Sequence, residues 1–236
     1  MGGRYWVWLG VRLLVAVAIV AWAASYLSTG SGEKEFQKTL EAMRQVRSFR
    51  ATLTATPYTQ KNELQWEVDC DRNLVHSQRH YVNTCSNPPD CGKQADFSQE
   101  ELDGAVHEYA RQNDGSWAAS RYQTGMKAVG FCGGLAQGAE IAPFPPIATM
   151  IKRGILQKGD KKEVNGVKCR EWLVTMKGAP NGLEHDTVCL GLEDRLPYEW
   201  TVDWEHSRAS FSDYNTAIQF DLPEEVLRET SASGSN

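Results

Sequence analysis

Cysteine is the residue type in this chain whose number and spacing most directly imply chemistry. The six cysteines are Cys70, Cys85, Cys91, Cys132, Cys169 and Cys189. An even number favours disulfides in an oxidising compartment, and no two cysteines have the spacing of roughly two to four residues that zinc sites use. Cys169 is expected to pair with Cys189, since both fall on neighbouring predicted strands. Cys85 with Cys91 and Cys70 with Cys132 are further candidate pairs.

The histidines show no recognised catalytic or metal-binding arrangement. His107 and His185 each precede an acidic residue, but neighbours in a strand point to opposite faces. His76 and His80 lie four residues apart without a third ligand nearby, which is typical of surface residues. We therefore predict a protein that is not an enzyme and has no metal site and no cofactor. An enzyme would require His107, His185 or His206 to meet a carboxylate in a cleft.

Residues 1–29 have the composition of a targeting segment. Arg4 and Arg12 precede an apolar run from Leu13 to Leu27 that contains an A-x-A pattern. This predicts export to the periplasm or cell envelope, either with cleavage of a signal peptide or with residues 5–27 kept as an inner-membrane anchor. The run is shorter than the roughly 20 residues that cross a bilayer, and a longer span would include Arg12. Both alternatives stay open.

The charge of the chain argues against nucleic acid as a partner. The formal net charge is −5, and the sequence contains no basic cluster. Contacts to phosphates require a positively charged stripe. We therefore expect no nucleic-acid binding.

Alternation of apolar and polar residues predicts an antiparallel sheet over much of the chain. Tyr198, Trp200, Val202 and Trp204 alternate with polar residues, as in a strand with one buried face. The same reasoning predicts strands at Ser48–Thr56, Leu64–Cys70, Ala105–Arg111, Ser116–Tyr122, Val167–Met176, Leu183–Leu190, Pro197–Glu205, Arg208–Tyr214 and Ala217–Asp221. Asn165 and Gly166 form the clearest hairpin turn, because a type I′ turn requires positive φ at both central residues.

Apolar residues at helical spacing predict two helices. One covers Glu33–Val46, and the other runs from Ile147 to about Leu156 after Pro146. A capping-box pattern at Ser98–Glu101 favours a short third helix.

Three other segments are expected to lack regular structure. Gly125–Gly138 is rich in glycine and is predicted as a loop. Asn83–Gly92 contains two prolines and two cysteines and is predicted as a stapled loop, within a longer stretch, Asp71–Ser98, where periodicity fades. The end of the chain is charged and then rich in serine and glycine, which predicts a frayed tail.

These features together resemble the LolA/LppX superfamily of exported lipid and lipoprotein carriers. They are the exported N-terminus, a helix over Leu40–Arg50, a hairpin, a proline-introduced middle helix, and the Leu196-Pro197 strand followed by Ala209–Asn215. The resemblance implies an α+β fold whose curved antiparallel sheet forms an incomplete β-barrel with a few helices on its concave side. The chain departs from the family in lacking a lipobox cysteine and in having six cysteines.

The predicted organisation has three parts. Residues 1–29 are the signal peptide or membrane anchor, residues 30–223 the LolA/LppX-like half-barrel domain, and residues 224–236 the C-terminal tail. A sheet of seven or more strands has more apolar surface than two short helices can cover, so the domain has either a filled core or a ligand cavity. Each buried methylene contributes about 0.8 kcal/mol, so a suitably shaped cavity could hold an acyl chain without polar contacts.

The residues expected to line such a cavity lie on the apolar side of the strands and on the middle helix. They are Leu53, Leu64, Trp66, Val68, Phe144, Ile147, Met150, Ile151, Trp172, Val174, Trp200, Val202 and Phe211. We predict a non-enzymatic exported protein that binds a lipid or an acylated lipoprotein and contacts the membrane through its N-terminal segment if that is uncleaved. The alternative is an envelope protein–protein interaction module with a filled core. A void below roughly 300 Å³ would favour the alternative.

Overall fold

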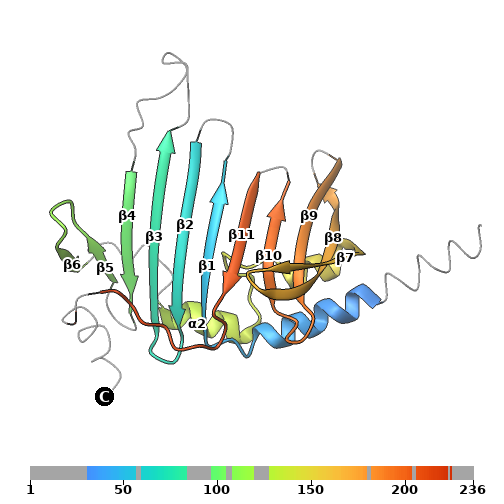
Figure 1. Ribbon diagram of the computed structural model, residues 1–236, viewed down its shortest axis with the longest axis horizontal. Coiled ribbons are helices and arrows are strands. Elements are labelled where there is room, and N and C mark those ends of the chain that lie inside the picture. Colours follow the sequence, from blue (N-terminus) through green and yellow to red (C-terminus); the bar gives the residue numbers. More distant parts are fainter. Residues whose placement is uncertain are drawn as a thin grey trace, which may run out of the picture.

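The computed structural model of the chain describes residues 31–56, 60–83, 97–104, 108–119, 128–179, 182–203, 206–222 and 224. Its main feature is one antiparallel sheet of 11 strands, with helices packed along one of its faces (Figure 1). The strands are β1 (Ser48–Ala55), β2 (Gln60–Asp69), β3 (Leu74–Asn83), β4 (Phe97–Asp103), β5 (Glu108–Arg111), β6 (Trp117–Ala119), β7 (Gly154–Val164), β8 (Val167–Ala179), β9 (Gly182–Gly191), β10 (Pro197–Val202) and β11 (Ser207–Ser212).

The strand order shows that the sheet is open. It runs β6-β5-β4-β3-β2-β1-β11-β10-β9-β8-β7, so strands that pair in the sheet are consecutive in sequence, except for β1 and β11. The edge strands are β6 and β7, which do not pair with each other. The predicted α+β fold with an incomplete antiparallel barrel is therefore confirmed.

The two faces of the sheet differ in chemistry. Phe49 of β1 lies opposite Val68 of β2, and both are fully buried. The next residue, Arg50, lies opposite Glu67, and its Nε donates a hydrogen bond of 2.8 Å to that carboxylate. We call the face that carries Phe49 the inner face and the face that carries Arg50 the outer face.

Helical segments cover the inner face. They are the N-terminal helix at residues 31–43, α2 (Ala128–Gln137) and α3 (Ile147–Arg153). Phe36 of the N-terminal helix meets Trp172 of β8 edge to face, with ring centroids 5.8 Å apart. Phe131 of α2 stacks on Phe49 at 6.3 Å. The predicted first and middle helices are both present, although the middle one is shorter than expected.

An aromatic cluster connects the two halves of the sheet with the segment between α2 and α3. The ring of Phe144, in that segment, lies 4.7 Å from Phe49 of β1 and 5.0 Å from Phe211 of β11. The rings of Phe144 and Phe211 are nearly parallel, with an interplanar angle of 3°. All three side chains are at most 4% exposed. The junction between β1 and β11 is therefore the centre of the core.

The predicted loop at Gly125–Gly138 is wrong over the part that the structure describes, because α2 forms there. Ala128, Phe131 and Leu135 recur at helical spacing and are all buried. Cys132, on the same helix, is bridged to Cys70 at the end of β2. Packing and a disulfide thus override the poor helix propensity of the glycines.

Two further predictions fail because the middle of β3 and most of β4 are polar on both faces. β3 lies within Asp71–Ser98, where no strand was expected, and β4 occupies the site of the predicted short helix at Ser98. On β3, Ser77 and Arg79 share the inner face, while Gln78 and His80 lie on the outer face. Without apolar alternation, periodicity cannot reveal such strands.

The middle helix ends at Arg153, three residues before its predicted end at Leu156. The following β7 begins at Gly154, where an added Cβ would lie 2.5 Å from the carbonyl oxygen of Met150. The predicted turn at its other end is confirmed, since Asn165 and Gly166 have φ of 51° and 80°.

The predicted strand at Ala217–Asp221 is also wrong, because this segment crosses the outer face as a strap. Ile218 and Phe220 pack with Leu74, Leu102 and Tyr109 in a second, smaller core. We call residues 213–222 the C-terminal strap.

Two of the predicted disulfides are confirmed. The bridges are Cys169–Cys189, between β8 and β9, and Cys70–Cys132. Cys85 and Cys91 lie outside the described residues. The two bridges agree with export to an oxidising compartment. Among the helices that the structure describes, none has the length and apolar character needed to span a membrane.

The aromatic cluster generates a prediction about stability. Replacing Phe211 by alanine opens a cavity at the β1–β11 junction, so we expect Phe211→Ala to lower the free energy of unfolding by about 3–5 kcal/mol. Ile155→Ala, at a strand position that is 36% exposed, should change it by only about 0.5 kcal/mol. Urea denaturation of the oxidised protein measures both, and similar losses in the two variants would contradict the packing described.

Candidate functional site

Most of the candidate cavity residues belong to the filled core of the half-barrel. Eight of them are 6% exposed or less: Val68, Phe144, Ile147, Met150, Trp172, Val174, Val202 and Phe211. All but Val202 lie in one cluster with the helices that cover the inner face. The chain's own side chains therefore occupy the interior over this part of the sheet.

The other five candidates, Leu53, Leu64, Trp66, Ile151 and Trp200, are partly exposed. Leu64 lies opposite Leu53, and the strand beyond carries Ala209 opposite both Leu53 and Trp200. A row of apolar side chains thus crosses β2, β1, β11 and β10 on the inner face. We call Leu53, Leu64, Trp66 and Trp200 the apolar strip.

A hollow of about 310 Å³ lies at one end of the apolar strip. It is lined by Leu64, Trp66, Ser77, Gln78, Arg79, Gln99 and Glu101. Two of these residues are apolar and five are polar or charged, which is more polar than an ordinary acyl-chain site. Sequence periodicity identified its two apolar residues and missed the polar ones, because β3 and β4 were not predicted.

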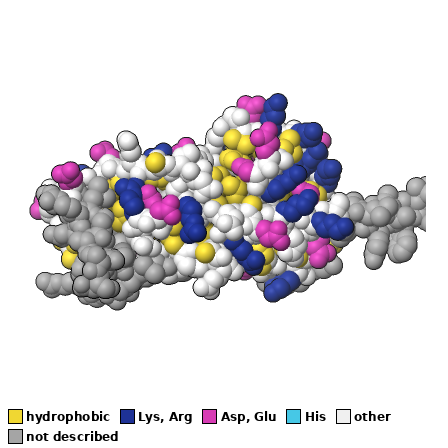
Figure 2. Space-filling model, turned by 90° about the horizontal axis from the view of Figure 1, so that it is seen from below, with side chains coloured by type: hydrophobic (Ala, Val, Ile, Leu, Met, Phe, Trp, Pro, Cys, Tyr) yellow, Lys and Arg dark blue, Asp and Glu magenta, His cyan; other side chains and the backbone are white. Residues whose placement is uncertain are grey.

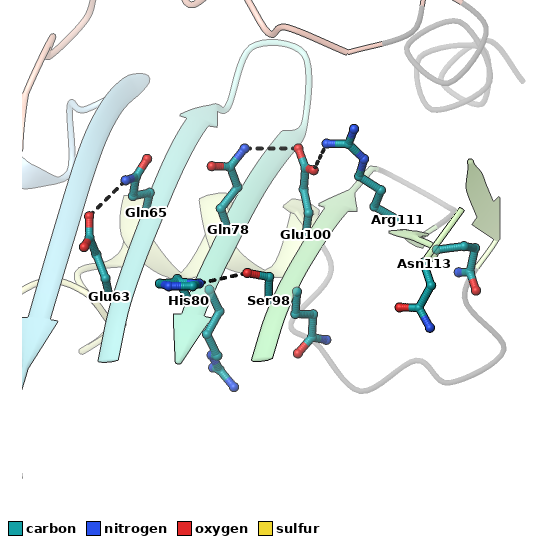
Figure 3. A pocket seen from close by; sticks show the side chains of 11 residues that line it. Glu63, Gln65, Gln78, His80, Ser98, Glu100, Arg111 and Asn113 are labelled. Atoms are coloured by element: carbon teal, nitrogen blue, oxygen red, sulfur yellow. Dashed lines mark hydrogen bonds and ion pairs between the residues drawn. The ribbon is translucent and has the colours of Figure 1, made fainter. Parts of the chain in front are cut away.

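A larger pocket, of about 620 Å³, lies across β2, β3, β4 and β5 (Figure 3). It is lined by Glu63, Gln65, Gln78, Arg79, His80, Ser98, Gln99, Glu100, Arg111, Gln112 and Asn113. We call this pocket the outer groove. None of its residues was among the candidates from sequence.

Strand register arranges the outer groove in rows. Glu63, His80 and Ser98 lie opposite one another on successive strands, and His80 Nδ1 is 2.8 Å from Ser98 Oγ. In the next row, Gln78 Nε2 donates to Glu100 Oε1 at 3.1 Å, and Arg111 Nη1 lies 2.8 Å from Glu100 Oε2. Figure 3 shows these side chains rising from the strands toward one side. The groove therefore presents amide, hydroxyl and charged groups at regular spacing.

An ion-pair network forms the floor between the outer groove and the C-terminal strap. Arg50 binds Glu67, and His76 lies between Glu67 and Glu100, with Nδ1 3.1 Å from Glu67 Oε2 and Nε2 2.9 Å from Glu100 Oε1. Arg111, which pairs with Glu100, is the last member of this network. A second hollow of about 320 Å³ borders this network and reaches Asp221 of the strap.

His76 is not the surface residue that its spacing from His80 suggested. Its side chain is only 5% exposed, and its ring lies 6.4 Å from both Trp117 and Phe220. Burial alone would lower the pKa of His76, but hydrogen bonds to Glu67 and Glu100 outweigh burial and raise the pKa above its ordinary value. The same contacts hold the pKa of both carboxyl groups below the usual range, with help from Arg50 and Arg111. A protonated His76 can donate to both carboxylates at once.

The other histidines do not converge with a carboxylate in the described hydrogen bonds. His185 Nδ1 lies 3.1 Å from Thr175 Oγ1, and His206 occupies a turn with φ of 46°. His107 lies outside the described residues. Within the parts of the chain that the structure covers, no cluster of three or more His, Cys, Asp or Glu side chains could hold a metal ion.

The environment of His76 predicts how stability changes with pH. Because its folded-state pKa is raised, its contribution is full below the ordinary value of 6.5 and is lost as the pH rises through the folded-state value. Burial and the charges of Glu108 and Glu101 raise the pKa of Asp103 to about 7. Its contribution to the free energy of unfolding is therefore lost over a lower pH range, from 3.8 to about 7. We therefore expect the free energy of unfolding of the wild type to fall as the pH rises above 6.5, and this fall to be smaller in His76→Gln.

Urea denaturation at a series of pH values checks this prediction, with Asp103→Asn as the control. That variant should lose the part of the fall that Asp103 contributes between pH 3.8 and about 7 and keep the part that depends on His76. Curves of identical shape for wild type and His76→Gln above pH 6.5 would show that His76 is not held protonated.

Comparison with known proteins places the chain beside several solved structures. No family model and no curated protein sequence matches it. It is similar to MucB of Pseudomonas aeruginosa, solved in complex with MucA, at 16% identity and a TM-score of 0.41 over 84% of this chain and 60% of that one. The chain thus spans about three fifths of the MucB chain that it matches.

Two other similar structures have lower TM-scores. A LolA superfamily protein from Nitrosomonas europaea has 10% identity and a TM-score of 0.27 over 83% of this chain and 96% of that one. A DUF1329 family protein from Desulfovibrio piger has 8% identity and a TM-score of 0.29 over 85% and 99%. A LolA superfamily protein is therefore among the structures that this chain resembles, as the sequence predicted.

Proposed function

We propose that this protein is an exported, non-enzymatic binding module of the cell envelope that holds a segment of another protein in its outer groove. The observation that carries the proposal is the filled interior. Phe144 and its buried neighbours, among them Phe49, Phe131, Ile147 and Met150, occupy the space where the half-barrel could have held a ligand. Recognition is therefore assigned to the surface, where the outer groove offers about 620 Å³.

The chemistry of the outer groove suits a polypeptide. Each residue of a peptide presents one backbone donor and one acceptor, and the groove offers Gln65, Gln78 and Ser98 on successive strands. Its two arginines, Arg79 and Arg111, balance the charge of its two glutamates, Glu63 and Glu100. A partner therefore need not bring a strong charge of one sign, which favours a mixed polar segment over a highly charged ligand.

Photo-crosslinking in the cells that export the protein tests this function. We expect a benzoylphenylalanine at Gln78 to form an adduct with one other protein, and the same residue at Gln157 to form none. Gln157 is exposed on β7, at the opposite end of the sheet. Ser98→Trp should fill the groove and abolish the adduct at position 78. Equal adducts at both positions, or none at position 78, would refute the proposal.

A second candidate function is the binding of a lipid or of the acyl part of a lipoprotein. The apolar strip favours it, because four large apolar side chains in adjacent positions remain partly exposed beside a hollow of about 310 Å³. Trp200 is held in place by a hydrogen bond of 3.3 Å from Nε1 to Asp186 Oδ2. An acyl chain lying along the strip would cover Leu53 and Leu64 and gain about 0.8 kcal/mol for each methylene that it buries.

Quenching by a brominated fatty acid tests this second function. Bromine quenches only the tryptophans that it touches, so we expect Trp66→Phe to remove much of the quenching. Trp117→Phe, on the outer face, should leave the quenching unchanged. Absence of any saturable quenching in the wild type, or equal effects of the two variants, would exclude acyl binding at the strip.

A further inference from the structure

The end of α3 and the hairpin of β7 and β8 are rich in basic side chains. Residues 152–170 contain seven lysines and arginines against two acidic residues, in a chain whose net charge is −5. The exposed ones are Lys152, Arg153, Lys158, Lys161 and Lys168, which we call the basic edge. The expectation of no basic cluster is therefore wrong for this stretch of the sequence, whose basic residues strand pairing brings to one edge of the sheet.

The register of β7 and β8 places much of the basic edge on one face. Lys158 lies opposite Trp172 and Lys161 lies opposite Arg170. Residues two apart on a strand share a face, so Lys168 belongs to the same side as Arg170 and Trp172. This is the inner face, at the end of the sheet where β7 is the unpaired edge strand. Figure 2 shows Lys and Arg side chains gathered at this end.

Lys162 of β7 is not part of the basic edge. Lys162 points to the other face, where its Nζ lies 2.7 Å from carboxylate oxygens of both Glu171 and Glu199. Its charge is therefore compensated within the protein. The exposed lysines on the inner side, Lys158 and Lys161, share β7 with two exposed acidic residues, Asp160 and Glu163, so basic residues remain in excess at this edge.

The described chain begins against this same edge. At Gly32, in the first turn of the N-terminal helix, an added Cβ would lie 2.9 Å from Cβ of Leu156 and 3.1 Å from the Trp172 ring. The apolar run Leu13–Leu27 ends only four residues before Ser31. Four residues span at most about 14 Å, so a bilayer that held the apolar run would lie next to the basic edge.

We propose that the basic edge is a membrane-docking surface for anionic lipid headgroups, placed beside the point where the N-terminal segment leaves the domain. Lysines near an anionic membrane strengthen attachment by roughly fivefold each, equivalent to about 1 kcal/mol. Glu163, exposed and paired with Lys168 on the same face as Lys161, marks a position that such docking brings to the headgroup layer. This docking is independent of what the outer groove binds.

The full chain, reconstituted in vesicles, tests the proposal. A polarity-sensitive fluorescent amino acid at position 163, on the same face as Lys161 and Lys168, should shift to the blue in vesicles of phosphatidylglycerol and phosphatidylcholine at low salt. The shift should vanish at high salt and in vesicles of phosphatidylcholine alone. The double variant Lys158→Gln, Lys161→Gln should lower the ratio of docked to undocked molecules by roughly 25-fold.

A matched double variant controls for net charge. Arg47→Gln with Lys61→Gln removes the same charge from exposed positions on and beside the central strands and should leave the docked fraction unchanged. An equal loss in the two double variants, or the same blue shift in neutral vesicles, would overturn the proposal. So would a shift that soluble polyglutamate produces and anionic vesicles do not, since it would identify an acidic polypeptide as the partner.

Discussion

The structure depends on covering the inner face of an open sheet with very little helix. Three short helical segments cannot shield 11 strands. Large aromatic side chains are therefore concentrated where the two halves of the sheet meet. Phe144 packs between Phe49 and Phe211, and these residues come from the beginning, middle and end of the domain. Because the β1–β11 pairing joins segments more than 150 residues apart, this packing is what holds the two halves in one fold.

The parts of the fold that could be predicted are the strands with one face toward the core and the other toward solvent. In β1 and β10 the alternation is strict, because Phe49 and Val202 face the core while Arg50 and Thr201 do not. The pattern fails in β3, because the residues of its inner face no longer pack in the core after Val75. The next residue on that face is the polar Ser77. Periodicity reports burial on one side, so strands that lie beyond the helices are invisible to it.

The candidate site was harder to predict than the fold for the same reason. Apolar periodicity correctly selected residues of the inner face, but most of them, such as Met150 and Val174, are needed to fill the core. The outer groove consists of polar residues that lie side by side only because of the strand register. His76 and His80 are four apart, which in a strand places them on one face, yet the C-terminal strap buries one and leaves the other exposed. The strap's position follows from tertiary packing of Phe220 and cannot be read from its own sequence.

The separation of the two proposed surfaces has a physical consequence. Seven strand intervals separate β3, at the centre of the outer groove, from β7, which at about 4.8 Å each amounts to roughly 34 Å along the sheet. Exposed charges interact over about 8–10 Å at physiological salt, so headgroups bound at the basic edge would not change the field in the groove. A rigid sheet of this span can therefore hold its groove clear of the membrane while its opposite end is attached. Curvature of the open sheet, maintained by the Phe144 cluster, then sets the direction in which the groove faces.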